Sequence, residues 1–263
     1  MKISHFQNLK TWFDNFIQQF RNDNQKFSKN IQVKIDHTQY VCQLIRDIGS
    51  SEKLSEEDLR LAEIMALFHD IGRFEQFKKY GTFADAKSEN HAELGIRILK
   101  ENQVLKDLDQ ATGDLIMRVI SYHNRRSLPD KESNQCLFYS KMLRDADKLD
   151  IFRVVTEYYY EKSLGRKNEA IELDLPDTPE LSEQIFMDFE AGRVPDYKDM
   201  RSLNDFKVVQ LSWVYDLNFK RSFEILMQRK YLEQIRNALP NLPRVDSLFK
   251  KVSDYTQKRI ASE

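Results

Sequence analysis

The residues of this sequence with the clearest chemical potential are His69 and Asp70, which stand side by side at the end of an apolar segment that begins at Leu61. A helix that is apolar on every side is typical of a protein interior. An imidazole and a carboxylate buried there cost free energy unless a partner compensates them. Both groups are common metal ligands, so the pair indicates a metal site. We expect the helix to end at Gly72 in a left-handed conformation, which would direct Arg73 into a cleft.

Three further histidines, His37, His91 and His123, and the carboxylate of Asp147 fall on inward faces of other expected helices. A single histidine on an apolar face is usually a core residue with a hydrogen-bond partner. Separate burial of several such groups costs ~1–3 kcal/mol for each unpaired one. A shared metal centre removes this cost, because neutral imidazoles and carboxylates donate to a cation. We therefore predict one metal centre from these residues: His37, His69, Asp70, His91, His123 and Asp147.

The ligand types restrict the metal. The set contains no cysteine, which argues against a structural zinc site. Mixed histidine and aspartate ligands suit Mn, Fe, Co, Ni or Zn, and Mg less well. A carboxylate such as Asp70 can bridge two ions, and the set is larger than one catalytic ion with open positions needs. We predict one or two divalent ions.

The segments that must position these residues show helical periodicity and no strong strand alternation. The chain of 263 residues has only 7 Gly and 6 Pro, which favours an all-α protein. The first part is expected to form helices over 6–20, 31–48, 59–70, 91–101, 113–123 and 135–150, the last continuing to 162. After a charged, proline-containing linker at 165–179, we expect helices over 181–190, 204–217, 218–239 and 245–260. Ser55 and Ser202 begin sequences typical of helix-capping boxes.

The length allows one large domain or two small ones. We expect a single all-helical domain over 1–263, with a core at about 30–160 and a C-terminal helical extension at about 180–263. The extension carries aromatic residues at core spacing and no histidine. We expect it to complete the helical bundle, with a regulatory role or a homodimer contact as the alternative.

Charge and composition limit the partners. The 41 Lys and Arg balance 42 Asp and Glu, whereas a nucleic-acid binder usually has a basic excess. No run of ~18 apolar residues could span a membrane. The first residues lack the apolar core of a signal peptide. Cys42 and Cys136 lie in helical patterns, where we expect buried thiols in a reducing compartment. These features predict a cytoplasmic protein without membrane or nucleic-acid partners.

At these residues the chain resembles the HD-domain superfamily. The signature of that family is a histidine, an adjacent His-Asp pair and a distant aspartate, which match His37, His69, Asp70 and Asp147. The last three stand in the sequences FHDIGRFEQF and RDADKLDIF. The resemblance covers roughly residues 30 to 160. It implies an HD-like helical bundle with additional C-terminal helices, and the activity of a metal-dependent phosphohydrolase.

The resemblance also implies how the ligands are divided. A first metal would be bound by His37, His69, Asp70 and Asp147. Subfamilies with two metals add histidines at positions that match His91 and His123, with Asp70 as the bridge. Asn124 stands where some two-metal phosphodiesterases have a second adjacent histidine, and no GYP-type motif follows. Hydrolysis of cyclic dinucleotides is therefore disfavoured.

Hydrolysis of a phosphate ester also needs cations that hold the phosphate, and arginine suits this best. Arg73, Lys148 and Arg125 each lie within three residues of a predicted ligand. We predict Asp70, Arg73 and Lys148 as catalytic residues, and Arg73, Lys148 and Arg125 as substrate-binding residues. The alternative for each cation is a surface residue or an ion-pair partner.

The polar segment 78–90, after the His-Asp pair, could gate the site. The candidates for a general acid lie in it or next to it: Glu75, Asp85, Lys87 and Glu89. For each of them the alternative is a solvated loop residue.

We expect a phosphomonoesterase or phosphodiesterase that uses metal-activated water on a nucleotide or another small phosphorylated metabolite. A different class stays open, because some HD-fold proteins with the order His, His-Asp, His, His, Asp are di-iron oxygenases. A regulatory module with an inactive site is a third alternative, against which the complete ligand set argues. The balanced charge disfavours a nuclease.

Overall fold

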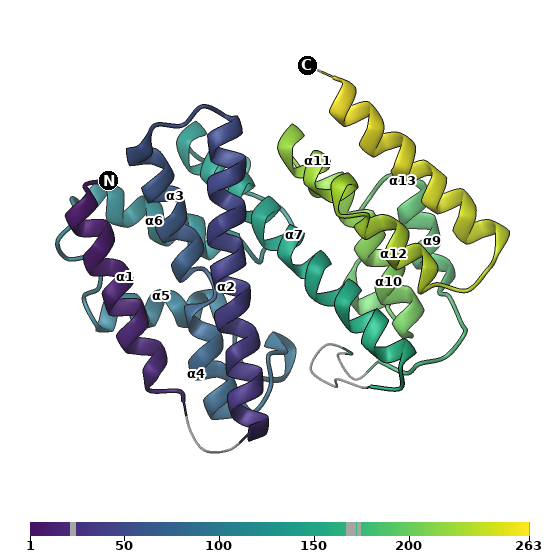
Figure 1. Cartoon of the computed structure of the whole chain (residues 1–263), viewed down its shortest axis with the longest axis horizontal. Coiled ribbons are helices and arrows are strands. Elements are labelled where there is room, and N and C mark those ends of the chain that lie inside the picture. The colour runs from purple at the N-terminus through teal and green to yellow at the C-terminus, as the bar shows by residue number, and fades with distance from the viewer. Residues whose placement is uncertain (22–24, 167–171, 173–174, 263) are drawn as a thin grey trace. The chain divides into compact units, whose positions relative to one another are not determined.

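The computed structural model describes residues 1–21, 25–166, 172 and 175–262, and this part of the chain contains helices and no strand. The prediction of an all-α fold is therefore confirmed. The described residues divide into two compact units, Met1–Asp150 and Ile151–Glu263. Figure 1 traces the first unit from purple to teal and the second from teal to yellow. The single domain over 1–263 stays a prediction.

The first unit contains α1 (Ile3–Gln18), α2 (Gln25–Ser51), α3 (Glu56–Phe68), α4 (Ile71–Tyr80), the 3-10 turn η1 (Asp85–Lys87), α5 (His91–Glu101), α6 (Gln110–Tyr122) and the first part of α7 (Asn134–Ser163). The second contains the rest of α7, α9 (Glu183–Glu190), η2 (Tyr197–Asp199), α10 (Leu203–Ser212), η3 (Trp213–Asp216), α11 (Lys220–Gln228), α12 (Tyr231–Asn237) and α13 (Pro243–Ala261). No helix in the described residues is long and apolar enough to cross a membrane.

The predicted helix through the His-Asp pair is interrupted. Helix α3 ends at Phe68, Asp70 adopts φ −104° and ψ 14°, and α4 starts at Ile71. Gly72 therefore lies inside a helix, and the prediction of a left-handed end there is wrong. That end falls at Gly81, where φ is 67°. The interruption turns the chain at Asp70, so that its carboxylate leaves the helical ladder at a fixed angle.

Gly72 is instead required for helix packing. A Cβ atom at this position would lie 2.1 Å from the carbonyl oxygen of His91 and 2.7 Å from the amide nitrogen of Gly95. Helix α4 packs against α5 along this contact. Because the two backbones meet where α5 begins, the contact sets the distance between Asp70 and His91.

Aromatic residues of α1 and of the turn that follows it support the junction of α3 and α4. The ring of Phe13 lies 6.1 Å from both Phe68 and Phe74, and Phe20 lies 5.7 Å from Phe74. Edge-on and tilted pairs of this kind each contribute about 0.5–1.5 kcal/mol beyond burial of their area. The aromatic cluster therefore holds the His-Asp turn in place from the side of α1.

The helix caps follow the sequence. The Ser55 hydroxyl accepts from the amide of Asp58 at 3.2 Å, and Ser202 accepts from the amide of Asp205 at 3.1 Å, so the N-cap half of both predicted capping boxes is confirmed. Each cap satisfies an amide that the helix leaves unpaired, which contributes about 1 kcal/mol.

Other boundaries differ from the prediction. Helix α2 starts at Gln25 and passes Gly49 to end at Ser51. The segment 218–239 forms two helices, because Lys230 adopts a left-handed φ of 55° between α11 and α12. Helix α10 tightens into η3 after Ser212. The predicted linker 165–179 lies partly outside the described residues.

The aromatic stripe of the second unit forms its core, as predicted. Phe206, Trp213 and Phe223 are buried, and Trp213 lies 5.5 Å from the ring of Phe152. The cysteines in the first unit, Cys42 and Cys136, are buried free thiols, which confirms their expected burial.

Candidate metal centre

Five helices bring the six predicted ligands together in the first unit. Each ligand lies within a helix or directly at its end, and we call the set the His/Asp cluster: His37 in α2, His69 and Asp70 after α3, His91 opening α5, His123 after α6 and Asp147 in α7. Five of the six are buried, and the side chain of Asp147 is 17% exposed. Buried polar groups need partners, so the contacts within the cluster indicate what it can bind.

Asp70 lies at the middle of the cluster. Its Oδ2 atom faces Nε2 of His37 at 3.6 Å and Nε2 of His69 at 3.8 Å. Its Oδ1 atom faces Nε2 of His91 at 3.3 Å and Nε2 of His123 at 3.8 Å. Each carboxylate oxygen therefore serves a different pair of imidazoles, which is the arrangement of a carboxylate that can bridge two ions.

Asp147 completes the side of the cluster near His37. Its Oδ1 atom lies 3.2 Å from Nε2 of His37 and 3.8 Å from Nε2 of His69. Three groups of potential ligand atoms lie within 4.8 Å of one another: His37, His69 and Asp70; His69, His123 and Asp147; and Asp70, His91 and His123. The groups overlap at Asp70, His69 and His123, so adjacent positions can share ligands.

Main-chain carbonyls orient two of the histidines. Nδ1 of His69 lies 2.7 Å from the carbonyl oxygen of Ala66, and Nδ1 of His123 lies 2.7 Å from that of Ile120. A carbonyl oxygen only accepts hydrogen bonds, so Nδ1 carries the proton and donates it. In a neutral ring Nε2 then keeps its lone pair, and in both residues this atom faces the cluster, as a metal ligand requires.

Carboxylates orient the other two histidines. Nδ1 of His37 lies 2.7 Å from Oδ2 of Asp150, and Nδ1 of His91 lies 2.7 Å from Oδ2 of Asp85. Carboxylate-bound imidazoles of this kind are frequent in metal sites, because the carboxylate fixes the ring and increases the basicity of the ligating nitrogen. All four imidazoles therefore direct Nε2 to the same place.

A divalent metal fits this donor set. Nε2 of His69 is buried and makes no hydrogen bond. Leaving such an atom unsatisfied costs ~1–3 kcal/mol. Burial lowers the pKa of His69 to about 4, so its ring is neutral at neutral pH and presents a lone pair. A cation next to Asp70 would satisfy this atom, whereas another hydrogen-bond acceptor would not.

Burial and neighbouring charged residues also shift the pKa values of His91 and His37. Burial, and then the charge of Arg73, lower the pKa of His91 to about 4. Burial and Lys34 act to lower the pKa of His37, but hydrogen bonds with Asp147 and Asp150 outweigh them and raise it to about 9. Metal binding at His37 therefore has to displace a proton at neutral pH.

The carboxylate of Asp70 is ionised despite its surroundings. Burial acts to raise its pKa, but the neighbouring cations, with Lys34 first, hold that pKa well below its usual range. Lys34 Nζ lies 2.8 Å from Oδ2 and Arg73 Nε lies 3.5 Å from Oδ1. One cation therefore lies at each oxygen of the central carboxylate.

Arg73 lies at the centre as the sequence predicts, but it is already engaged. Its Nη1 donates to Oδ1 of Asp85 at 2.8 Å, to Oε1 of Gln76 at 2.9 Å and to the carbonyl oxygen of Phe83. Its side chain is 16% exposed. Arg73 thus ties the segment 81–90 to Asp70.

The other two predicted substrate-binding cations are placed differently. Arg125 is exposed, donates from Nε to the carbonyl oxygen of Ser121 at 3.1 Å and lies 4.8 Å above the ring of Tyr122. Lys148 follows Asp147 in α7 and is half-buried. Their roles in substrate binding stay predictions.

Three residues at the cluster were not assigned to it from the sequence: Lys34, Asp85 and Asp150. Lys34 precedes His37 by one helical turn, and Asp150 follows Asp147 by three residues, so helical spacing was a usable signal for both. Asp85 was considered only as a general acid. It accepts from Arg73, Gln76 and His91, and its position in a loop gave no periodic signal.

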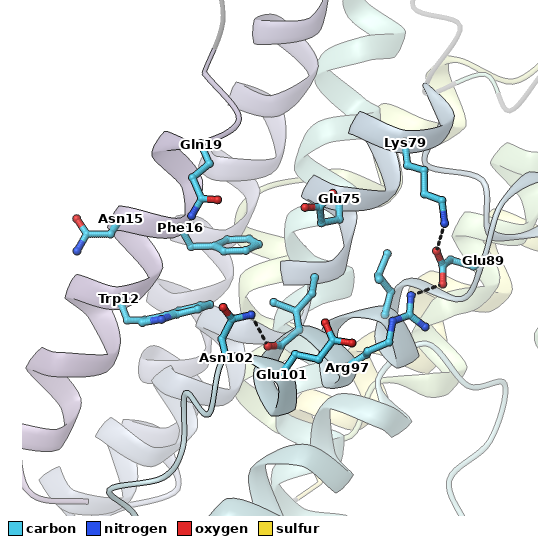
Figure 2. Close-up of a pocket in the computed structure, with 12 residues that line it drawn as sticks. Trp12, Asn15, Phe16, Gln19, Glu75, Lys79, Glu89, Arg97, Glu101 and Asn102 are labelled. Atoms are coloured by element: carbon cyan, nitrogen blue, oxygen red, sulfur yellow. Dashed lines mark hydrogen bonds and ion pairs between the residues drawn. The ribbon is translucent and has the colours of Figure 1, made fainter.

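A surface pocket of about 440 Å³ lies among α1, α4 and α5, apart from the His/Asp cluster (Figure 2). Trp12 and Phe16 form one wall. The carboxylate of Glu89, one of the candidate general acids, pairs there with Arg97 at 2.6 Å and with Lys79 at 3.7 Å. None of the predicted ligands lines this pocket.

The family comparison agrees with this geometry. Residues 35–151 match the family model of the HD domain, and this range contains every member of the His/Asp cluster. No curated protein and no solved structure matches the chain. Residues 35–151 therefore match the HD domain, a family that consists largely of metal-dependent hydrolases.

Proposed function

We propose that this chain is a metal-dependent phosphohydrolase that cleaves a phosphomonoester or phosphodiester of a nucleotide or another small phosphorylated metabolite. One observation carries the proposal. The two oxygens of Asp70 face separate imidazole pairs, His37 with His69 and His91 with His123. Four imidazole nitrogens that converge on one ionised carboxylate form a donor set that suits divalent transition-metal ions.

The residues have distinct roles in this proposal. A first metal would be held by His37, His69, Asp70 and Asp147, and a second by Asp70, His91 and His123. When bound, such ions supply a Lewis acid and lower the pKa of coordinated water to near neutrality. Mn, Fe, Co, Ni and Zn suit the donor set better than Mg does.

The cations at the centre would bind the phosphate. The guanidinium of Arg73 lies beside Asp70 and offers paired donors that match a phosphate group. Lys148 and Arg125 are proposed to assist it from α7 and from the segment after α6. The balance of 41 basic against 42 acidic residues favours a small substrate over a polymeric nucleic acid.

The test starts from protein purified without chelator or metal-affinity resin. Metal content is measured, and phosphate release is then assayed on a panel of nucleotides and sugar phosphates with Mn, Co, Ni, Zn and Mg. We expect one or two bound ions per chain and metal-dependent release from at least one class. A chain that takes up no metal on titration would contradict the proposal.

A di-iron oxygenase is the second candidate, and the complete set of four histidines and two aspartates around Asp70 is the observation that favours it. Iron would then activate oxygen in place of water. About two irons per chain together with substrate-dependent oxygen uptake would support the oxygenase. Phosphate release without oxygen uptake would exclude it.

We also propose a cytoplasmic location, since the buried free thiols of Cys42 and Cys136 suit a reducing compartment. A homodimer is the one macromolecular partner proposed, through the C-terminal helices. Light scattering on the full chain would test the dimer.

A further inference from the structure

Lys34 is the cation nearest to the central carboxylate. Its Nζ atom lies 2.8 Å from Oδ2 of Asp70, and its side chain is 19% exposed. It stands in α2, one turn before His37. We propose that Lys34 is a phosphate-binding residue of the centre, and that its ammonium and a divalent ion compete for the same oxygen of Asp70. This inference rests on the proposed function and assigns a further residue to it.

Lys34 and a metal ion would compete because both contact the same oxygen of Asp70. Oδ2 is the atom that faces Nε2 of His37 and Nε2 of His69, so it belongs to a group of atoms able to hold a metal. The short contact between this oxygen and the ammonium is weakened when the oxygen serves a divalent cation beside it, because the two positive charges repel. Metal binding at this position therefore favours release of the ammonium from Asp70.

The released ammonium stays close to the reaction site. Nζ of Lys34 lies 5.4 Å from the centre of the Phe83 ring, which the segment 81–90 places beside it. A cation over an aromatic face is held without losing its capacity to donate hydrogen bonds. Because four-fifths of the side chain is covered, the ammonium has little access to bulk water and gains from an anionic partner.

Arg73 and Lys34 differ in this respect. Arg73 Nε is 3.5 Å from Asp70, but its Nη1 also pairs with Asp85 at 2.8 Å. Arg73 therefore keeps a carboxylate partner when Asp70 serves a metal. Lys34 makes its short contact with Oδ2, the oxygen that the metal would take. Metal binding therefore affects the contact of Lys34 more than that of Arg73.

The chain offers a matched control. Nζ of Lys10 lies 3.2 Å from Oε1 of Glu63, whose side chain is 11% exposed, and 5.2 Å from the ring of Phe6. The pair thus repeats the contacts of Lys34: a lysine, a mostly buried carboxylate and an aromatic ring. Glu63 is outside the His/Asp cluster, so a lysine substitution there tests charge and packing alone.

The experiment uses the full chain and two titrations by calorimetry. Metal-free protein is titrated with Mn, and Mn-loaded protein is then titrated with inorganic phosphate. For Lys34→Met we expect Mn to bind more tightly, and phosphate to bind at least about tenfold more weakly, as for loss of a charge-assisted hydrogen bond. Lys34→Arg should keep phosphate affinity within about threefold, because it keeps the charge. Lys10→Met should change neither affinity.

The outcomes separate this inference from the proposed function. Phosphate binding to wild type with unchanged binding to Lys34→Met would overturn the role of Lys34 and leave the phosphohydrolase intact. Weaker Mn binding in Lys34→Met would overturn the competition. Mn-loaded wild type that binds no phosphate and releases none from any ester would overturn both. Lys34→Gln repeats the test if Lys34→Met does not fold.

Discussion

Both units of the chain bury a carboxylate, and the surroundings of the two differ. In the second unit Asp205 accepts hydrogen bonds from the amide and hydroxyl of Ser182, at 2.7 and 2.6 Å, and from the amide of Arg201 at 2.7 Å. In the first unit the imidazole nitrogens around Asp70 lie 3.3 to 3.8 Å away. Those distances exceed ordinary hydrogen bonds. Asp205 is thus satisfied by close donors of its own unit. Asp70 makes one short contact with Lys34 at 2.8 Å and faces four imidazole nitrogens at longer range, where a cation would fit.

The buried cation of the second unit confirms the contrast. Lys207 donates to Oδ1 of Asn204 at 2.9 Å and to the carbonyl oxygen of Ala238 at 2.7 Å. Burial lowers the pKa of Lys207, yet both contacts are neutral acceptors within the unit. Buried polarity alone therefore does not mark a functional site. Convergence of four imidazole Nε2 atoms on one carboxylate indicates such a site, and Nε2 of His69 makes no hydrogen bond there.

The largest expected effect is at Asp70. Asp70→Asn keeps the shape of the side chain but removes the charge that both imidazole pairs share. We expect loss of bound metal and a fall in phosphate release of roughly a thousandfold, equivalent to about 4 kcal/mol in the barrier. Metal analysis and turnover of the purified variant measure this. Retention of wild-type metal content would show that Asp70 resembles Asp205.

Asp205→Ala is the reciprocal test. It leaves the amides of Ser182 and Arg201 without their acceptor, and each buried unsatisfied group costs ~1–3 kcal/mol. We expect the free energy of unfolding of the second unit to fall by about 3–5 kcal/mol, with metal content per folded chain unchanged. Denaturant unfolding followed by circular dichroism measures it.

The control for that variant is Glu183→Ala. Glu183 is 68% exposed and pairs with Arg244 on the surface, so we expect a change of no more than about 1 kcal/mol. If Asp205→Ala released metal from the protein, the division between a structural and a ligating carboxylate would not hold.

Gly72→Ala tests whether metal binding depends on the spacing of α4 and α5 as well as on the chemistry of the ligands. The added Cβ would lie 2.1 Å from the carbonyl oxygen of His91, so α4 and α5 must separate. We expect a loss of about 2–3 kcal/mol in the free energy of unfolding, and weaker metal binding although every ligand is still present.

Gly113→Ala is the matched control, since Gly113 lies in α6 and a Cβ atom added there would meet Cβ of Leu105 at an ordinary contact distance of 3.9 Å. There the gain in helix propensity should stabilise the protein by up to about 1 kcal/mol. Unchanged metal affinity in Gly72→Ala would show that the position of His91 is not critical.

The sequence was sufficient to predict that the six residues of the His/Asp cluster lie together, because helical periodicity assigns residues to inward faces. His37, His91 and His123 were found in this way, together with the helices that hold them. The same reasoning failed where tertiary contacts decide the backbone. Nothing local marks the turn at Asp70, and no glycine or proline marks the break at Lys230.

Asp85 illustrates the remaining limit. It lies in a short 3-10 turn whose place is set by donors from distant segments, Arg73, Gln76 and His91. Loop residues have no periodicity that assigns them to a face, so a loop carboxylate that orients a histidine resembles any solvated one. Helical spacing places Lys34 near His37 and Asp150 near Asp147, but this signal is useful only once His37 and Asp147 are known to belong to the cluster.

The smallest expected effect divides the His/Asp cluster itself. His91 contacts Oδ1 of Asp70 and does not belong to the group that His37, His69 and Asp70 form, so His91→Ala should spare the metal held there. We expect one ion per chain to be weakened or lost and turnover to fall by about tenfold or more. Metal stoichiometry at saturating Mn measures this directly, with His5→Ala as the control for loss of a histidine outside the cluster. Equal stoichiometry in His91→Ala and wild type would reduce the centre to a single ion, and Asp70 would then be a ligand through Oδ2 alone.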